Sequence, residues 1–360
     1  MNHDLNHELE QAKDEAGEVQ QLPDTIRTRL DHTYRIIENS PPVRKKRYWT
    51  GLLVAVAASG LLIIGSGFIS PVMAEALKNI PVLGSIFLND GDEGLKTASR
   101  QGMITEVQQS VAHDGITMSI SELMYDGSRI SMVLTRQTID GKNESFGQLG
   151  SKASQRGDVN GVRFYVDGEE LGNYGYSITG VGDGAPNSDI VTLSPEGLPD
   201  EFTLEVVIRD ISVSEPFRFS IPVKNSAADR AVLKSEEPKI HDNIHMEISS
   251  FKITPATMQM IVSITGKPGQ DLKEFIESVP DQYKVEDFIN IDYEVMNEKG
   301  EIAKSLGAMG SGSGSHLTFT FMYEPFPTKP KSITVRPYVY SSEHKKTYIP
   351  ELEFHLPVEE

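Results

Sequence analysis

One segment restricts the possible folds of this chain more than any other: the 22 residues from Tyr48 to Ile69 contain no charged side chain. As an α-helix they would span about 33 Å at 1.5 Å per residue, which matches the roughly 30 Å hydrocarbon core of a bilayer. Glycine, alanine and serine recur along the segment, and such small residues are common where membrane helices pack closely. We therefore expect one transmembrane helix at residues 48–69. A buried helix in a soluble core is the alternative.

The residues on either side of this segment predict its orientation. The six residues expected to anchor it at the membrane interface are Arg44, Lys45, Lys46, Arg47, Tyr48 and Trp49. The first basic residue on the other side is Lys78, so the positive-inside rule places the N-terminus in the cytoplasm and the chain from about residue 75 outside. A signal peptide cleaved after Ala74 is the competing interpretation, but the polar region before the apolar core is too long for an ordinary signal. We expect a single-pass cell-membrane protein with the bilayer as one partner.

The composition and the motif search argue against several classes of function. The chain has no cysteine and a net charge of -18, which excludes thiol chemistry and cysteine-bound metals and disfavours nucleic acid as a partner. No nucleophile elbow, phosphate loop or H-E-x-x-H motif occurs.

His241 and His245, taken as one strand, would lie roughly 13 Å apart along the chain. The acidic run 89–93 lacks calcium-loop spacing and reads as a turn, and the Gly-Ser run 310–315 reads as a flexible loop. We expect no enzyme activity, cofactor or metal site.

Two short amphipathic helices are predicted in the cytoplasmic segment, residues 1–47. Apolar residues recur at helical spacing from Leu5 to Val19, and a second stripe follows Pro23, where Asp24 can cap the helix. Neither helix can bury its stripe alone. We expect a partner protein to cover the stripes, with the membrane surface and a loosely ordered tether as alternatives. The predicted partner-binding residues are Leu5, Leu9, Ile26, Leu30, Tyr34 and Ile37.

The region outside the membrane contains an internal repeat. Residues 113–121 and 241–249 share six identities without a gap, and residues 217–223 resemble residues 352–358. Both ends of one unit thus recur about 130 residues later, as in tandem domains. We expect two related domains, with the break between them at residues 224–229.

Within each unit the apolar residues alternate with polar ones, which is typical of strands. Residues 125–128 and 254–256 occupy equivalent places and read as hairpin turns. Pro222 and Pro357 fit edge or terminal strand positions, where a missing backbone donor does no harm. We predict a mainly β fold with two tandem antiparallel β-sandwiches. The expected domains are 1–47, 48–69, a juxtamembrane helix with an apolar patch at 70–91, 92–226 and 227–360.

The residues after the apolar segment carry a family resemblance. They are Ser70 to Glu75, Lys78 to Phe87, Gly94 to Lys96, Asp114 to Thr117 and Tyr125 to Gly127. Over residues 45–225 the chain resembles the Gram-positive single-pass membrane proteins known as domain of unknown function 4179. The second unit resembles the immunoglobulin-like domain that often accompanies them. The resemblance implies an anti-sigma-like role, with an extracytoplasmic-function sigma factor as partner. Without cysteines, only a zinc-independent helical clamp is possible.

Two functions are compatible with these patterns. In the first, the cytoplasmic helices hold a partner such as a sigma factor while the external sandwiches sense an envelope condition. In the second, the cytoplasmic part is only a tether, and the sandwiches form an envelope-anchored binding or adhesion module for a wall polymer, a peptide or a partner ectodomain. The paired amphipathic stripes favour the first function.

Overall fold

The computed structural model describes most of the region after residue 84. The described ranges are 85–141, 144–149, 161–172, 174–182, 184–210, 212–227, 230–267, 269–285, 288–313, 315–340 and 345–358. All of them belong to one compact unit, Ile69–Glu360. The unit is built mainly of antiparallel strands, which confirms the mainly β prediction.

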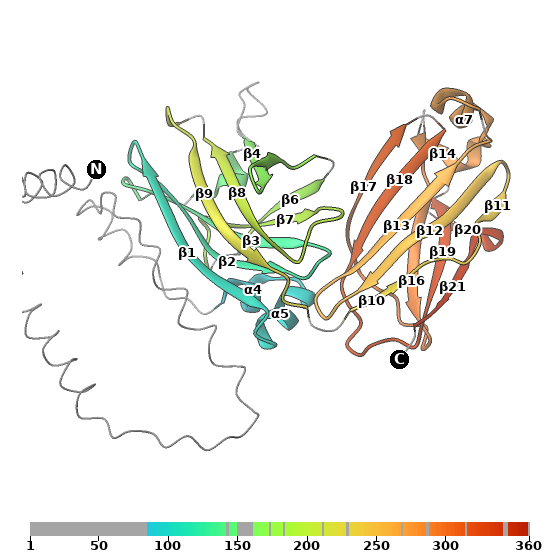
Figure 1. Ribbon diagram of the computed structural model, residues 1–360, viewed down its shortest axis with the longest axis horizontal. Coiled ribbons are helices and arrows are strands. Elements are labelled where there is room, and N and C mark those ends of the chain that lie inside the picture. The colour runs from blue at the N-terminus through green and yellow to red at the C-terminus, as the bar shows by residue number, and fades with distance from the viewer. Residues whose placement is uncertain are drawn as a thin grey trace, which may run out of the picture. The chain divides into compact units, whose positions relative to one another are not determined.

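Nine described strands form the first sandwich, and two helices precede it (Figure 1). The helices are α4 (Ile86–Asp90) and α5 (Glu93–Arg100). One sheet has the order β1 (Ile104–His113), β2 (Ile116–Tyr125), β3 (Ile130–Thr138), β7 (Ser188–Ser194) and β6 (Gly175–Gly180). The other has the order β5 (Glu169–Glu170), β4 (Gly161–Val166), β8 (Glu201–Arg209) and β9 (Phe217–Lys224). Strict alternation of buried and exposed residues along β9 shows why these segments fold as strands with one face on the core.

The second sandwich follows after a short linker (Figure 1). Its larger sheet contains β10 (Ala231–Leu233) and β11 (Lys239–His241), which both pair with β12 (Ile244–Ile253), and then β13 (Met258–Thr265), β18 (His316–Tyr323) and β17 (Ser305–Ser313). Its smaller sheet contains β16 (Asp292–Asn297), β19 (Ser332–Tyr340), β20 (Lys346–Tyr348) and β21 (Phe354–Pro357). Between β13 and β16 lie α7 (Leu272–Ser278), η1 (Asp281–Tyr283), β14 (Lys284–Val285) and β15 (Phe288–Ile289), while η2 (Pro350–Leu352) precedes β21.

The two sandwiches repeat one topology. The order β1-β2-β3-β7-β6 in the first corresponds to β10/β11-β12-β13-β18-β17 in the second, and β4, β8 and β9 correspond to β16, β19 and β20/β21. The repeat extends to local irregularities. A bulge interrupts β2 after Ile120 and β12 after Ile248, and these positions are equivalent in the repeated sequence. Each unit therefore buries its apolar residues between two sheets in the same way.

Tight turns at the start of each unit correct one prediction about the histidines. Asp114 and Gly115 both have positive φ, as do the equivalent Asp242 and Asn243, which is typical of a type I′ hairpin turn. The second turn places His241 at the end of β11 and His245 on the neighbouring strand β12. The assumption that both histidines share one strand was wrong, because a two-residue turn reverses the chain between them.

The structure also corrects the prediction for the Gly-Ser run. It was predicted as a flexible loop, yet residues 305–313 form the edge strand β17. Gly310 pairs with Phe319 and Gly312 pairs with Leu317 on β18. A Cβ atom on Gly310 would lie 2.8 Å from the Phe319 ring, so the large side chains of β18 occupy the space above the glycines. Cross-strand packing thus stabilises a strand whose own residues have low strand propensity.

The two prolines lie where the sequence predicted. Pro222 lies in β9, an edge strand that pairs with β8, and Pro357 is the last residue of β21. In both places a missing N–H group leaves the neighbouring strand's hydrogen bonds intact.

Candidate functional site

The residues predicted from the sequence to bind a partner and to anchor the chain all lie outside the described residues. This holds for the stripe residues Leu5 to Ile37, for the anchoring residues Arg44 to Trp49 and for the predicted span at 48–69. Among the residues that the structure describes, no helix is both long and apolar enough to cross a bilayer. The same part of the chain contains no cluster of three acidic or histidine side chains suited to a metal ion.

The most distinctive site in the described region is the contact between two equivalent hairpins, here called the hairpin junction. It consists of the β2–β3 turn, residues 126–129, and the β12–β13 turn with the first residues of β13, residues 254–259. Thr254 Oγ1 donates a hydrogen bond of 2.7 Å to Asp126 Oδ2. Gln259 Nε2 donates to the Ser128 carbonyl at 3.0 Å. Asp126 and Thr254 occupy the same position of the repeat, so the two domains meet through corresponding turns.

Each turn is shaped by its own first residue. Asp126 Oδ1 accepts hydrogen bonds from the backbone N–H groups of Ser128 and Arg129, both at 2.9 Å. Thr254 Oγ1 accepts from the N–H groups of Ala256 and Thr257 at 3.1 and 2.8 Å. These are the local side-chain turns that Asp and Thr favour. The turns are therefore formed within each domain and meet as rigid units.

Arg129 connects the junction to the helices that precede the first sandwich. Its guanidinium binds both carboxylate oxygens of Asp92, at 2.7 and 3.0 Å, and donates to the Ala256 carbonyl at 3.0 Å. The side chain of Arg129 is 1% exposed and that of Asp92 17%. Asp92 also caps α5 by accepting from Leu95 N at 3.0 Å. A two-pronged, buried ion pair of this kind fixes orientation as well as distance.

Gly94 marks the closest approach between α5 and the second sandwich. A Cβ atom at this position would lie 1.9 Å from the Ala256 carbonyl oxygen and 2.8 Å from Arg129 Nη2. No larger residue fits without moving backbone atoms. The sequence at the start of α5 is therefore adapted to contact with the β12–β13 turn.

An apolar cluster surrounds these polar contacts and contains the last residues of the predicted apolar patch. Phe87, at the end of the predicted patch, is fully buried. It shares a cluster with residues of α5, of the first sandwich and of the second; its buried members are Phe87, Leu95, Ala98, Met103, Met124, Val133, Ile190 and Ala256. Glu122 on β2 fixes the start of α4 by accepting from Ile86 N at 3.0 Å and from Ser85 Oγ at 3.0 Å. This end of the patch thus packs inside the domain, because α4 carries it there.

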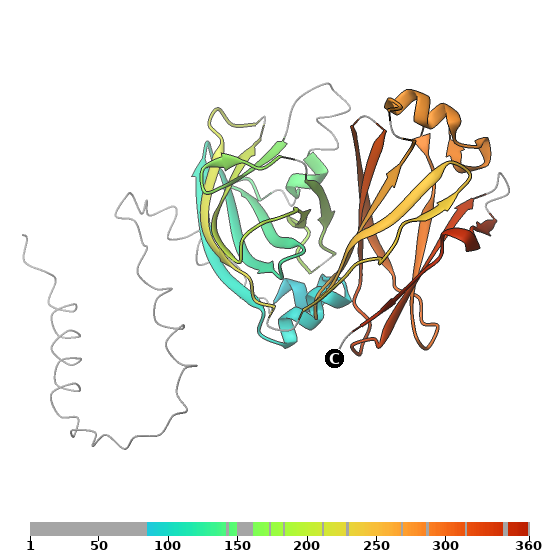
Figure 2. The same cartoon turned by 45° about the vertical axis from the view of Figure 1, so that its right-hand side comes forward.

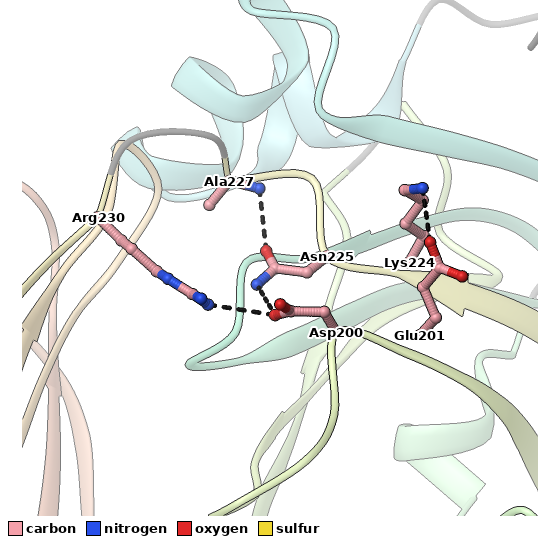
Figure 3. A pocket seen from close by; sticks show the side chains of 6 residues that line it. All are labelled: Asp200, Glu201, Lys224, Asn225, Ala227 and Arg230. Atoms are coloured by element: carbon pink, nitrogen blue, oxygen red, sulfur yellow. Dashed lines mark hydrogen bonds and ion pairs between the residues drawn. The ribbon is translucent and has the colours of Figure 1, made fainter.

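A polar linker site lies beside the hairpin junction. It has a volume of about 310 Å³ and is lined by Asp200, Glu201, Lys224, Asn225, Ala227 and Arg230 (Figure 3). Asp200 Oδ1 accepts from Asn225 Nδ2 at 2.7 Å and from Arg230 Nη1 at 3.1 Å. Asn225 Oδ1 accepts from Ala227 N at 3.0 Å. The charged groups satisfy one another, so this site holds the linker rather than a ligand.

Tyr125 attaches the linker to the first sandwich. Its carbonyl accepts from both N and Oγ of Ser226 at 2.9 Å, and its hydroxyl donates to the Pro199 carbonyl at 3.1 Å. Burial, with the nearby charge of Asp200, raises the pKa of the Tyr125 hydroxyl to about 12. The hydroxyl thus remains a hydrogen-bond donor at neutral pH.

Two family models match this chain, one on each side of the hairpin junction. Residues 44–138 match the family model described as Domain of unknown function (DUF4179). The chain carries a DUF4179 segment. Residues 231–359 match a second model, Family of unknown function (DUF5643). The DUF4179 segment supplies α4, α5, Asp92 and Arg129, and the DUF5643 segment supplies Thr254 to Gln259, so the hairpin junction joins the two family segments.

One solved structure resembles this chain in fold. The crystal structure of the conserved domain protein from Bacillus anthracis is 14% identical, with a TM-score of 0.50, and the match covers 77% of this chain and 98% of that one. The titin Ig tandem domains A164-A165 match at 11% identity over 64% of this chain and 88% of theirs, with a TM-score of 0.16. No curated protein matches.

The contribution of Asp92 to the free energy of unfolding should depend on pH. Burial alone would raise the pKa of its carboxyl, but the charge and hydrogen bonds of Arg129, with the N–H groups of Leu95 and Gly94, hold that pKa below the ordinary 3.8. A carboxyl with a lowered folded-state pKa stabilises the fold above its unfolded pKa and loses that contribution as pH falls through the folded value. We expect the difference in unfolding free energy between wild type and Asp92→Asn to be constant near neutral pH and to shrink below about pH 3.8. Urea titrations at several pH values test this, and a difference that grows on acidification would contradict it.

Proposed function

We propose that this protein is a membrane-anchored, non-enzymatic regulator of the anti-sigma-like kind. In this proposal the N-terminal helices lie in the cytoplasm and hold an extracytoplasmic-function sigma factor. The span at 48–69 crosses the cell membrane of a Gram-positive bacterium. The two sandwiches, the second of them immunoglobulin-like, lie outside and sense an envelope condition.

One observation supports signalling rather than mere anchoring. The first described segment after the proposed span, α4 and α5, is held by both sandwiches at once: Arg129 of the first sandwich binds Asp92, and Ala256 of the second lies against Gly94. In Figure 2 both helices lie beside the ends of the strands where the two sandwiches meet. Any ligand that moves the second sandwich would therefore change the contacts of the segment that leads to the membrane.

The junction is also suited to opening. Four of its buried polar atoms, Ser128 Oγ, Arg129 Nε, Thr257 Oγ1 and Gln259 Oε1, have no hydrogen-bond partner among the described residues. Buried polar groups without partners cost free energy that water would return on separation. The contact is thus less stable than an apolar interface with the same area, as a reversible switch requires.

A wedge at Gly94 tests the proposal. In an exposed helix, Gly→Ala stabilises by about 0.5–1 kcal/mol, but here the new methyl group would collide with the Ala256 carbonyl and separate the hairpins. We expect Gly94→Ala to release the partner and to raise sigma-dependent transcription in cells without envelope stress. A reporter gene measures this, and co-purification of the full chain with the sigma factor shows whether the partner is released.

The matched control is Gly161→Ala, because nothing lies within 4 Å of a Cβ atom there. This variant should leave transcription at the wild-type level. If Gly94→Ala, Gly161→Ala and deletion of the whole gene all gave wild-type transcription, the chain would not be a regulator of that sigma factor.

A further inference from the structure

A groove on the second sandwich has the features of a ligand site, and no part of the hairpin junction lines it. Its volume is about 710 Å³, and residues of the η1–β14 segment and of the edge strand β20 line it. Its lining includes Tyr283, Val285, Asn290, Tyr340, Tyr348 and Glu351. We call it the tyrosine groove.

One wall of the tyrosine groove is held rigid from behind. Glu294, which is buried, accepts hydrogen bonds from Tyr348 Oη and Lys346 Nζ, both at 3.1 Å. The Arg336 guanidinium lies 4.0 Å from the centre of the Tyr348 ring and 3.6 Å from Glu294. Contacts of this kind fix an aromatic ring before a ligand arrives, which lowers the entropy cost of binding.

The rim of the tyrosine groove exposes apolar surface. Val285 is 56% exposed and Tyr340 45%. These are two of the nine large hydrophobic side chains that are exposed in the described region. Their concentration around one concave site distinguishes them from the scattered exposed apolar residues that any surface carries.

The charges of the groove select the class of ligand. Its one lysine, Lys284, pairs with Asp281 at 3.1 Å, and Lys346 beside it pairs with Glu294. Among the described residues that line the groove, no cation remains without a carboxylate partner, and the net charge of the whole chain is -18. An anionic polymer is therefore disfavoured on electrostatic grounds.

We propose that the tyrosine groove binds a neutral oligosaccharide. The ring of Tyr340, which is 45% exposed, presents a flat apolar face that suits the C–H face of a sugar ring. The amides of Gln282 and Asn290 and the carboxylate of Glu351 line the same groove and can donate to and accept from sugar hydroxyls. This inference rests on the proposed function, since the sugar would be what the external domain detects.

Calorimetric titration of the purified full-length chain tests the inference, with the tetrasaccharides of glucose and of N-acetylglucosamine as probes. We expect saturable binding of at least one probe. Tyr340→Ala should weaken it about tenfold, because the loss of a stacked ring removes about 1.4 kcal/mol of binding free energy. The matched control is Tyr176→Ala on β6 of the first sandwich, which removes a tyrosine of similar exposure, 50%, and should leave the affinity unchanged.

Absence of saturable binding with both probes would overturn the inference. So would binding that survives Tyr340→Ala, or a groove that takes a neutral extended peptide and neither sugar. These titrations contain no sigma factor, whereas the Gly94 experiment contains no added sugar. A failure here therefore leaves the regulatory proposal to its own test.

Discussion

Replacing Arg129 by methionine should lower the free energy of unfolding of the first sandwich by about 3–5 kcal/mol, the usual cost of breaking one side of a buried ion pair. Methionine keeps most of the side-chain volume but removes the charge and every donor. The variant leaves Asp92 ionised, with 17% of its side chain exposed, and removes the guanidinium that binds both of its oxygens. It also leaves the Ala256 carbonyl without its donor. Urea unfolding followed by far-UV circular dichroism measures the loss.

The double variant Arg129→Met/Asp92→Asn separates the charge from the packing. Asparagine caps a helix about as well as aspartate, so α5 keeps its N-cap while the orphaned charge disappears. We expect the double variant to be more stable than Arg129→Met alone. If the two were equally destabilised, the loss would come from packing around Arg129, and the ion pair would contribute nothing measurable.

Neither member of this pair could be chosen from the sequence alone. Asp92 stood in an acidic run that reads as a turn, and its N-cap spacing to Leu95 is a local signal that says nothing of Arg129, 37 positions later. What the sequence did contain was the repeat. Aligning residues 126 and 254 as equivalent turns was correct, and the structure adds that equivalent turns touch. Contact between domains is a tertiary property that periodicity does not encode.

The strands also show where prediction from the sequence succeeded and where it failed. Alternating apolar residues predicted strands at β2, β8 and β13, because a strand with one face on the core repeats its apolar residues with a period of two. The pattern failed for β17, where glycine and serine carry no hydrophobic signal and the apolar side chains that cover the strand come from β18. The Asp-Gly pair at residues 114–115 was a readable hairpin signal, and with it the reversal at the equivalent residues 242–243 could have been predicted.

Replacing Asp210 by alanine should be as damaging as the loss of Arg129. Asp210 Oδ2 accepts from Arg136 Nε at 3.0 Å, and Asp210 Oδ1 accepts from Ser212 N at 2.8 Å. The side chains of Arg136 and Asp210 are 5% and 0% exposed. The pair connects β3 of one sheet with the residue after β8 of the other. Removal of the carboxylate leaves a buried guanidinium without the anion that it binds in the described structure, at a cost of about 3–5 kcal/mol in unfolding free energy.

An exposed ion pair serves as the control, because its loss should change the unfolding free energy far less than the loss of a buried pair. Lys273 and Glu277 on α7 form an ion pair of 3.7 Å with side chains 84% and 67% exposed, so Glu277→Ala should change the unfolding free energy by only about 0.3–0.5 kcal/mol. Arg136→Met/Asp210→Ala removes both charges and should regain part of the loss, since buried ion pairs replaced by apolar residues are often tolerated. Urea titrations of the three variants decide the matter. Equal effects of Asp210→Ala and Glu277→Ala would show that water reaches the Arg136–Asp210 pair, and that this pair contributes little to holding the two sheets of the first sandwich together.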